Sequence, residues 1–447
     1  MRRLLIANRG EIAVRIAKSA RALGIETVAI ASEADRDSLA TRVADRFVVI
    51  GPAAAKDSYL NADAVLAAAK ETGCDAVHPG YGFLSENAGF ARAVQAAGLI
   101  WVGPDPDTIE LMGDKSNAIR AARDAGVPVL AGSGGPLGPD DDAIEIARRV
   151  GYPLLVKASA GGGGRGIRHV ADESELLSTI ELAQTEAGSV FGDPSVYLER
   201  FVAHARHVEV QLLGDGESCI HLGDRDCSMQ RRSQKVIEEA PAPSIPNHVR
   251  EQMRASSVHL AVSSGYRGAG TVEFLYDAER QEAAFIEMNT RLQVEHTITE
   301  EITGIDLVAE QLRIADGGAL GLVQSDIRLD GHSIECRINA EDPSQGFFPS
   351  PGVISVLDWP EGTRADAGFE AGDTVAPFYD SMIAKLIVHA PTRAEAIAAM
   401  RSALQGTRIE GIKTTIPLHL RLLEDPAFLA IAHHTKTIES GTILEEL

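Results

Sequence analysis

Lysine is scarce in this chain of 447 residues, and arginine supplies most of its positive charge. Lysine and arginine together number 42 against 64 acidic residues, which gives a formal net charge of −22. An excess of negative charge this large argues against nucleic acid or an anionic membrane as a partner. Because lysine is rare here, a lysine within an apolar stretch is a candidate functional group. The lysines are Lys18, Lys56, Lys70, Lys115, Lys157, Lys235, Lys385, Lys413 and Lys436.

Cysteines and long hydrophobic runs are also sparse. Cys74, Cys219, Cys227 and Cys336 show no paired metal-ligand spacing, so we interpret them as reduced structural thiols. No apolar run is long enough to span a membrane, and the N-terminus enters Leu4–Ala7 at once, leaving no room for a signal peptide. We therefore expect a cytoplasmic protein. Its length exceeds what one hydrophobic core usually holds, which predicts two or three domains.

Strand-like and helix-like segments alternate at the N-terminus. In chain order they are strand Leu4–Asn8, helix Glu11–Leu23, strand Glu26–Ala31, helix Asn61–Thr72 and strand Ala76–His78. This rhythm is typical of βαβ units around a parallel sheet. The Asn8–Gly10 turn has no Gly-x-Gly-x-x-Gly pattern, which a dinucleotide requires. We expect a Rossmann-like scaffold without a bound dinucleotide.

Two further segments follow. Gly132–Asp142 is rich in Gly, Pro and Asp and predicts a linker into a small lid. The expected lid elements are strands Pro153–Lys157, Ile167–Val170 and Ser195–Glu199, with a helix near Glu173–Ala187. Another segment begins after Arg328, with expected strands Ile354–Leu357 and Ile383–His389 and a helix over Arg393–Gln405.

The glycine run Ala160–Gly166 formally contains Gly-x-Gly-x-x-Gly, but a strand-like segment follows it where a dinucleotide site needs a helix. It is not a Walker A loop either, since Ile167 follows Gly166. The run is typical of a flexible flap whose N–H groups fold over phosphates, and a simple hairpin loop remains the alternative. Lys157 favours the flap, because an unpaired ammonium at the end of an apolar strand is costly and an ATP phosphate is a natural partner.

Polar side chains occupy every second position from Glu287 to Glu295. In an extended chain they share one face, in the order Glu287, Asn289, Arg291, Gln293 and Glu295. An exposed edge strand would alternate too, but the apolar run before Glu287 favours a metal-and-anion site. Full extension would cover roughly 26 Å, too long for one pocket. We predict that the strand ends near Asn289 and that the following residues curl back as a loop.

A second strand-like run carries the lone carboxylate Glu273 and is joined to the first by a polar loop. If the two runs pair antiparallel, Glu273 and Glu287 approach each other. Neighbouring carboxylates repel unless a cation lies between them. With the Asn289 amide oxygen they form a hard-oxygen set suited to Mg²⁺ or Mn²⁺. A protonated or water-bridged acid pair is the alternative.

Several motifs together resemble the biotin carboxylases, the ATP-grasp components of biotin-dependent carboxylases. They are Ile6–Ala13, His78–Asn87, Met112–Lys115, Glu273 with Glu287–His296, and Glu335–Pro343, in that family's order. The resemblance implies a multidomain fold, α/β and α+β, with an ATP-grasp centre. The implied domains are a Rossmann-like N-terminal domain over 1–113, an ATP-grasp domain over 114–330 with a lid at about 131–203, and a C-terminal biotin carboxylase domain over 331–447.

The resemblance also implies nucleotide contacts. Lys115 and Lys157 would meet the α- and β-phosphates, Gly163 and Gly164 would lie in the covering loop, and His207 would lie near the ribose. Glu273 and Glu287 would hold ATP through the metal. The implied adenine-reading hinge is Glu199, Arg200, Phe201 and Val202. At Ser233 many relatives carry His or Asn, and the shorter serine puts that ribose-side contact in doubt.

Catalytic roles are implied in the same way. Lys235, Arg291 and the Val294 amide would bind bicarbonate, and Glu295 would be its general base. Phosphorylation by ATP would turn bicarbonate into carboxyphosphate. Arg337 would stabilise the enolate-like oxygen of deprotonated biotin. Without the resemblance, an ordinary salt bridge of Arg337 with Glu335 or Glu341 would be favoured.

The function implied is ATP- and bicarbonate-dependent carboxylation of biotin on a separate biotin carboxyl carrier protein. This is the first half-reaction of an acetyl-CoA carboxylase in fatty acid biosynthesis, with pyruvate and propionyl-CoA carboxylase as alternatives. The chain contains no Met-Lys-Met biotin-attachment motif, so the expected partners are a carrier and a carboxyltransferase subunit, and relatives are commonly homodimers. A biotin-independent ATP-grasp ligase and a non-catalytic nucleotide-binding regulator are the other hypotheses.

Overall fold

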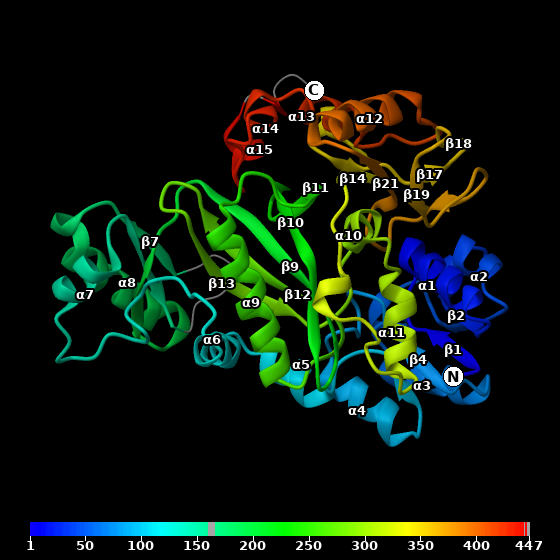
Figure 1. The fold of residues 1–447 in the computed structure, drawn as a ribbon, viewed down its shortest axis with the longest axis horizontal. Coiled ribbons are helices and arrows are strands. Elements are labelled where there is room, and N and C mark those ends of the chain that lie inside the picture. Colours follow the sequence, from blue (N-terminus) through cyan, green and yellow to red (C-terminus); the bar gives the residue numbers. More distant parts are fainter. Residues whose placement is uncertain (160–165, 442, 445–447) are drawn as a thin grey trace. The chain divides into compact units, whose positions relative to one another are not determined.

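A parallel five-stranded sheet forms the N-terminal part of the computed structural model, which describes residues 1–159, 166–441 and 443–444 (Figure 1). Its strand order is β3-β2-β1-β4-β5, and the pairing is parallel throughout. The predicted βαβ rhythm is therefore confirmed. The elements are β1 (Arg3–Ile6), α1 (Gly10–Ala22), β2 (Glu26–Ser32), α2 (Leu39–Val43), β3 (Arg46–Gly51), α3 (Ala62–Glu71), β4 (Ala76–His78), α4 (Ala88–Ala96), β5 (Ile100–Trp101), α5 (Pro106–Gly113) and α6 (Lys115–Asp124).

The chain divides into two units, one over Pro128–Ala205 and the other over Met1–Val127 with Arg206–Leu447. The smaller unit has a three-stranded antiparallel sheet in the order β7-β6-β8. In its central strand Leu154, Val156 and Ala158 are buried and alternate with less buried residues, as one covered sheet face requires. Its elements are α7 (Ala143–Val150), β6 (Leu154–Ala158), β7 (Ile167–Val170), α8 (Glu173–Phe191) and β8 (Val196–Arg200).

An eight-stranded sheet dominates the larger unit, in the order β13-β12-β9-β10-β11-β14-β21-β19. Because β11 pairs with β14, this sheet continues across the expected domain boundary at 330/331. Its strands are β9 (Ala205–Asp215), β10 (Cys219–Arg231), β11 (Gln234–Ala240), β12 (Arg267–Asp277), β13 (Glu282–Asn289), β14 (His332–Asn339), β19 (Arg364–Ala367) and β21 (Met382–Ala390). The helices between them are α9 (Asn247–Ser263), α10 (His296–Thr303), α11 (Leu307–Ala315) and α12 (Arg393–Gly406).

Shorter elements complete the C-terminal segment, and one sequence prediction is wrong there. The expected single strand Ile354–Leu357 is split, because one part of the chain pairs β17 with β20 and the next part pairs β18 with β22. Ile354 lies between the two strands and is fully buried. These elements are β15 (Glu341–Asp342), β16 (Phe348–Pro349), β17 (Gly352–Val353), β18 (Val356–Asp358), β20 (Thr374–Val375), β22 (Arg408–Glu410), α13 (Ile416–Leu422), α14 (Pro426–Leu429) and α15 (Thr437–Ser440).

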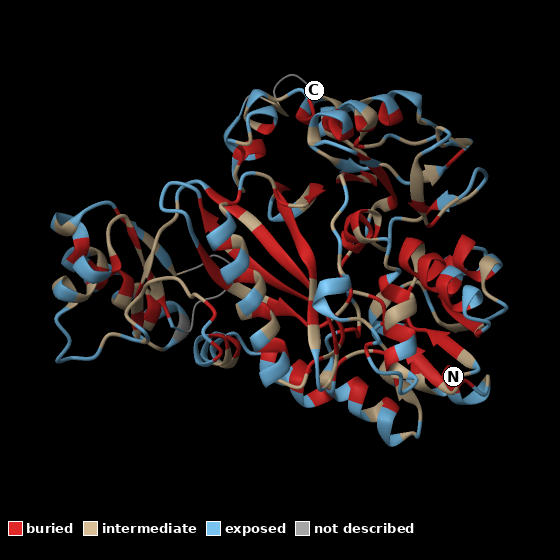
Figure 2. Cartoon of the chain, viewed as in Figure 1, coloured by how far each residue is buried: buried red, intermediate tan, exposed pale blue. Residues whose placement is uncertain are grey.

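The central strands of the large sheet are largely buried (Figure 2). Buried charge is unusual in such a sheet, because an ion removed from water needs partners. Yet Glu209, Arg225, Glu238 and Glu335 are each fully buried on β9, β10, β11 and β14. This concentration of buried ions locates the candidate site.

All four cysteines are free, which agrees with their interpretation as reduced thiols. Among the residues that the structure describes, no helix combines the length and the apolar character that crossing a bilayer requires.

Candidate active site

Glu273 and Glu287 lie directly opposite each other where β12 pairs with β13. The predicted antiparallel pairing is confirmed, and β13 ends at Asn289 as expected. Burial raises the pKa of Glu287, the charge of Glu273 raises it further, and Lys115 acts in the opposite direction. Glu273 itself has a lowered pKa because of Lys235 and His207, so Glu287 is the acid of the pair that lacks a sufficient cation.

Beyond Asn289 the chain leaves the sheet and forms the predicted loop. Within it, Arg291 donates from Nη2 to Asn289 Oδ1 at 2.8 Å and from Nε to Glu86 Oε2 at 2.9 Å. Gln293 turns back and donates from Nε2 to Glu273 Oε1 at 2.6 Å. The loop therefore returns its polar side chains to the acid hairpin.

Lys235 on β11 is the cation at the centre of the acids. Its ammonium donates to Glu209 Oε2 at 2.7 Å, to Glu273 Oε1 at 3.1 Å and to the Glu295 carboxylate. Burial works to lower the pKa of Lys235, but the negative charges around it, those of Glu209, Glu295 and Glu273 among them, hold that pKa well above its ordinary value. Lys235 is therefore a permanent positive charge in the site.

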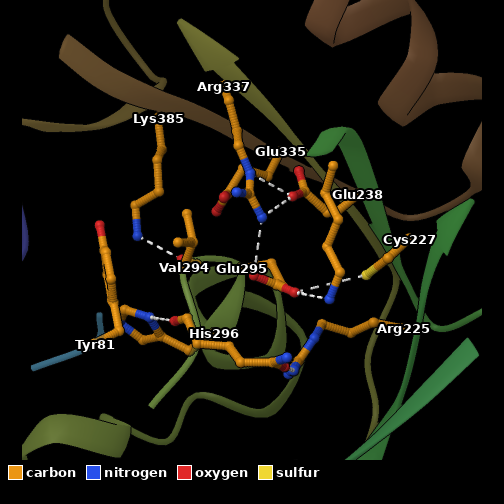
Figure 3. A network of polar contacts seen from close by, with 12 residues as sticks. Tyr81, Arg225, Cys227, Glu238, Val294, Glu295, His296, Glu335, Arg337 and Lys385 are labelled. Carbon is orange, nitrogen blue, oxygen red and sulfur yellow. Dashed lines mark hydrogen bonds and ion pairs between the residues drawn. The ribbon is translucent and has the colours of Figure 1, made fainter. Parts of the chain in front are cut away.

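Glu295 contacts both Lys235 and Arg337. The Nη2 of Arg337 is 3.0 Å from Glu295 Oε2 (Figure 3). Burial works to raise the pKa of Glu295, but the charges of Lys235 and Arg337 outweigh it and hold that pKa well below its ordinary value. This direction agrees with the expectation that Glu295 stays ionised. Glu295 is therefore in the unprotonated form that a general base requires, while the lowered pKa also makes it a weaker base as long as both cations stay in contact with it.

Arg337 pairs with acids other than those expected from the sequence. Its Nε donates to Glu238 Oε1 at 2.6 Å, and its second partner is Glu295. The alternative of an ion pair with Glu335 or Glu341 is thus wrong, because Glu335 accepts from the Thr297 hydroxyl instead and Glu341 from the Ser381 hydroxyl.

Arg225 is a residue that sequence reasoning missed. Its guanidinium is fully buried and donates to Glu209 Oε1 at 2.5 Å, Gln211 Oε1 at 2.6 Å and Gln293 Oε1 at 2.8 Å. Glu209, Glu238 and Lys385 were missed as well. A signal was present, because Glu209 and Gln211 alternate with the apolar residues Val208, Val210 and Leu212 on β9, the period at which one sheet face repeats.

The expected ribose-side residues differ in their surroundings. His207 contacts Glu273 Oε2 from Nε2 at 3.1 Å and Gln230 Nε2 from Nδ1 at 2.9 Å, so it lies beside the acid hairpin. Ser233 is exposed in the turn between β10 and β11 at a φ of 63°. Lys115 is exposed and opens α6.

The smaller unit contains the residues expected to bind the phosphates and the adenine, and their contacts there are with other residues of the same unit. The sequence suggested that the Lys157 ammonium has no partner within the protein. In the structure it pairs with the Glu199 carboxylate on the neighbouring strand. Arg200 donates from Nε to Val150 O at 2.8 Å. Phe201 packs edge-on against the His169 ring at 4.8 Å, and Val202 follows it in the chain. The predicted loop residues Gly163 and Gly164 lie outside the described residues.

A cavity of about 640 Å³ opens within the larger unit and gathers most of the predicted residues of that unit. Tyr81 and Tyr379 also line it, although the sequence did not single them out. A volume of this size accommodates a small-molecule site with convergent polar groups. The predicted residues on its wall are His207, Ser233, Lys235, Glu273, Glu287, Asn289, Arg291, Val294, Glu295 and Arg337.

Two sets of metal ligands share Glu273. One is the predicted set with Glu287 and Asn289, and the other is His207 with Glu209, whose ligand atoms lie within 4.8 Å of one another. Residues of both sets already have partners, because Glu209 is bound by Arg225 and Lys235, and Glu273 by Lys235 and Gln293. The all-oxygen set fits Mg²⁺ or Mn²⁺ better, because these ions prefer oxygen ligands.

Three family models together match most of the chain. "Biotin carboxylase, N-terminal domain" matches residues 1–109. "Carbamoyl-phosphate synthase L chain, ATP binding domain" matches residues 114–323, and "Biotin carboxylase C-terminal domain" matches residues 335–440.

Full-length relatives carry the same similarity. The chain is 50% identical over 447 residues to "Biotin carboxylase 1" of Bacillus subtilis (strain 168), with 99% of each sequence covered. It is 47% identical over 440 residues to a pyruvate carboxylase subunit of Methanothermobacter thermautotrophicus, covering 98% of this chain and 89% of that one.

Among solved structures, one similar fold is the biotin carboxylase domain dimer of Hydrogenobacter thermophilus 2-oxoglutarate carboxylase, in complex with MgADP, ADP and bicarbonate. The TM-score is 0.86 at 46% identity, with 99% of this chain and 98% of that chain covered. These matches confirm the predicted fold class, an ATP-grasp fold with a Rossmann-like N-terminal domain and a C-terminal domain of the same family.

Proposed function

Since this chain belongs to the biotin carboxylase family and is an ATP-dependent ligase of that class, we propose that it carboxylates biotin on a separate carrier protein as the first half-reaction of an acetyl-CoA carboxylase. The observation that carries the proposal is the position of Glu295, an ionised carboxylate between Lys235 and Arg337 on the wall of one cavity. A base, an anion-binding cation and a guanidinium are the groups that joining bicarbonate to biotin requires.

The acid hairpin is the proposed metal site, with Glu273, Glu287 and Asn289 as ligands of Mg²⁺ or Mn²⁺. The bound ion would screen the charge of the ATP phosphates during phosphoryl transfer. Two observations support this assignment: Glu273 and Glu287 lie directly opposite each other on paired strands, and the pKa of Glu287 is raised. For binding, Glu273 must exchange its contact with the Lys235 ammonium for one with the ion.

Bicarbonate is the proposed anion next to Glu295. The planar fork of Arg291 suits a carboxylate, and Lys235 and the Val294 amide complete the anion pocket. Glu295 then takes the bicarbonate proton as the bicarbonate oxygen attacks the γ-phosphorus of ATP, which releases ADP and forms carboxyphosphate. Lys235 is suited to this role because the three acids around it raise its pKa and keep its ammonium protonated.

Arg337 is the proposed biotin residue. Carboxyphosphate breaks down to CO₂ and phosphate, the released phosphate takes the proton of the ureido nitrogen of biotin, and that nitrogen then attacks CO₂. The negative charge that loss of the proton leaves on the ureido oxygen is stabilised by a fixed guanidinium. Glu238 contacts Arg337 through both Nε, at 2.6 Å, and Nη2, at 2.5 Å, and the same Nη2 reaches Glu295 at 3.0 Å, so the two acids together fix the guanidinium.

The nucleotide contacts remain those predicted from the sequence. We assign Lys115 and Lys157 to the phosphates, Gly163 and Gly164 to the covering loop, and Glu199, Arg200, Phe201 and Val202 to the adenine. His207 and Ser233 are assigned to the ribose side. For Lys157, binding a phosphate means releasing the Glu199 carboxylate.

The final acceptor depends on a partner protein. Acetyl-CoA is our proposal, and pyruvate is the second candidate because the Methanothermobacter relative, at 47% identity, belongs to a pyruvate carboxylase. The proposal is completed by a biotin carboxyl carrier protein, a carboxyltransferase subunit, a second copy of this chain and a cytoplasmic location. Another relative is named as part of a 2-oxoglutarate carboxylase, so family members work in carboxylases of different acceptors.

The test is ATP hydrolysis by the purified chain with Mg²⁺, measured with and without bicarbonate and with and without free biotin. We expect hydrolysis that needs bicarbonate and is accelerated by biotin. Hydrolysis that is independent of both would favour a biotin-independent ligase. Purification of the tagged chain from its own cells, followed by identification of the bound subunits, would then decide the acceptor, since a partner that binds only pyruvate would overturn the acetyl-CoA assignment.

A further inference from the structure

Two buried side chains donate to consecutive backbone carbonyls of the loop that carries Val294 and Glu295 (Figure 3). His296 Nδ1 lies 2.7 Å from Gln293 O, and Lys385 Nζ lies 2.7 Å from Val294 O. A carbonyl oxygen can only accept, so Nδ1 of His296 carries the proton. Burial and the neighbouring cations hold the pKa of His296 well below its ordinary value, so this imidazole is a neutral donor with a defined tautomer.

These two contacts, together with the backbone N–H of His296 that donates to Gln293 O at 3.3 Å, orient the N–H groups of the loop. In a planar trans peptide the C=O and N–H bonds point in opposite directions. Gln293 O shares its peptide with the Val294 N–H, and Val294 O shares its peptide with the Glu295 N–H. Holding the Gln293 oxygen at His296 therefore directs the Val294 N–H away from His296, and holding the Val294 oxygen at Lys385 directs the Glu295 N–H away from Lys385. Within the described part of the chain, no hydrogen bond takes up the Val294 N–H.

A lysine is unusual at position 385, because this position is fully buried. Lys385 lies on β21, where a buried ammonium is costly unless it is paired and hydrogen-bonded. Its partners are the Val294 carbonyl and Glu11 Oε2 at 3.5 Å. Glu11 in turn accepts from the Tyr81 hydroxyl, and Tyr81 lines the cavity. A methionine of similar length would fill the same volume without any charge, so the ammonium has a task that packing does not explain.

We propose that Lys385 and His296 are positioning residues that orient the Val294 and Glu295 peptides for the bicarbonate anion. The inference rests on the proposed function of the same cavity. Neither residue touches the anion, and both act through the backbone. Because a rigid donor loses little freedom when it binds an anion, loss of either contact weakens bicarbonate binding more than ATP binding.

A purely structural role for Lys385 makes a different prediction. If Lys385 served only to neutralise Glu11, a variant that removes both charges would behave as the unchanged protein. If it orients the loop, the same variant regains stability but not bicarbonate affinity. Lys385→Met and the double variant Glu11→Gln/Lys385→Met therefore separate the two roles, and Lys413→Met at an exposed lysine is the matched control.

The measurement is the KM of each variant for bicarbonate and for ATP in the ATP hydrolysis assay, together with the melting temperature. We expect Lys385→Met to raise the KM for bicarbonate about tenfold or more, the usual effect of losing a charged hydrogen bond, with the KM for ATP changed less than about twofold. The double variant should recover the part of the melting temperature that depends on Glu11 and keep the raised KM; recovery is partial because the charge of Lys385 also lowers the pKa of Asp366 and acts against the raised pKa of Glu335. A wild-type KM in the double variant, or in Lys385→Met itself, would overturn the proposal.

His296 supplies an independent arm of the experiment. Asn carries its amide nitrogen near the place of Nδ1 and retains the donor, whereas Leu removes it. We expect His296→Leu to raise the KM for bicarbonate and His296→Asn to restore it in large part, and equal values for the two variants would contradict the inference. If the unchanged protein shows no bicarbonate-dependent hydrolysis, the proposed function has failed. If it does and these variants leave the KM unaltered, the positioning role alone has failed.

Discussion

Glu238 lies directly opposite Glu335 where β11 pairs with β14, and each has one buried carboxylate oxygen without a hydrogen-bond partner among the described residues. Arg337 takes one oxygen of Glu238, and the Thr297 hydroxyl takes one oxygen of Glu335. Two facing acids with unsatisfied oxygens are stable when a proton is present on one of them. Burial raises the pKa of Glu238 to about 7 and that of Glu335 to about 8.

The first prediction concerns pH and stability. An acid whose pKa is higher in the folded protein than in the unfolded chain retains its proton longer when folded, so the free energy of unfolding falls as pH rises between the two values. We expect stability to fall between about pH 5 and pH 8, by up to about 1.4 kcal/mol per pH unit for one proton. Glu335→Gln should show a smaller fall, measured by denaturant unfolding at several pH values.

The matched control for that experiment is Glu251→Gln, which changes an exposed acid of α9. Its stability should depend on pH as that of the unchanged protein does. Parallel curves for Glu335→Gln and the unchanged protein would mean that this acid is already ionised throughout the range.

The second prediction concerns Glu295 as base. Glu295→Gln keeps the shape of the side chain but removes the proton acceptor, and a general base typically contributes at least about 100-fold to a rate. We expect bicarbonate-dependent ATP hydrolysis to fall by about that factor, whereas ATP affinity, measured by calorimetry, stays close to that of the unchanged protein. An unaltered rate would exclude Glu295 as the base.

The third prediction separates Arg337 from the bicarbonate step. Arg337→Met removes the guanidinium proposed to stabilise deprotonated biotin. The factor by which free biotin accelerates ATP hydrolysis should therefore fall by about tenfold or more. Bicarbonate-dependent hydrolysis without biotin should persist. The exposed residue Arg408 provides the control variant Arg408→Met. If biotin still stimulated the Arg337→Met variant, the role of Arg337 would be contradicted.

The fourth prediction concerns the metal. Removal of divalent ions by a chelator should abolish hydrolysis, and Mg²⁺ or Mn²⁺ should restore it. Glu287→Gln should raise the Mg²⁺ concentration needed for half-maximal activity by more than about tenfold, since even groups behind a metal ligand change affinity 10–100-fold. Glu282→Gln, at the exposed start of the same strand, is the control. An equal Mg²⁺ requirement in both variants would favour the ligand set of His207 and Glu209.

Local pattern predicted the N-terminal half of the fold well. The strand and helix expected at Glu26–Ala31 and Asn61–Thr72 are observed as β2 and α3 with ends shifted by one residue. Period-2 alternation is a strong signal, and it also located the end of β13 at Asn289. The C-terminal strands were harder, because Ile354 reads as part of one apolar strand while its neighbours pair with two different partners.

Glu273 on β12 was predictable because it stands as a charge among apolar neighbours, and the loop residues because their polar side chains alternate, whereas Lys235 on β11 follows a polar run and was implied by the family resemblance alone. Their partners were not predictable in the same way. Glu238 reaches Arg337 across a sequence separation of 99 residues, and Lys385 reaches Val294 across 91. Such contacts depend on how strands of distant sequence are ordered in the sheet, which no local periodicity encodes.

The continuity of the eight-stranded sheet has a consequence for how this active site varies among relatives. Neighbouring strands are held about 4.8 Å apart by their backbone ladders, and β11 and β14, which carry Lys235 and Arg337, are immediate neighbours. The spacing between the backbones that carry the two cations is therefore set by peptide geometry, while the acids that they contact position the charged ends of the side chains. Substitutions in the surrounding loops can alter which carrier or acceptor is served, while the distance between the β11 and β14 backbones stays the same.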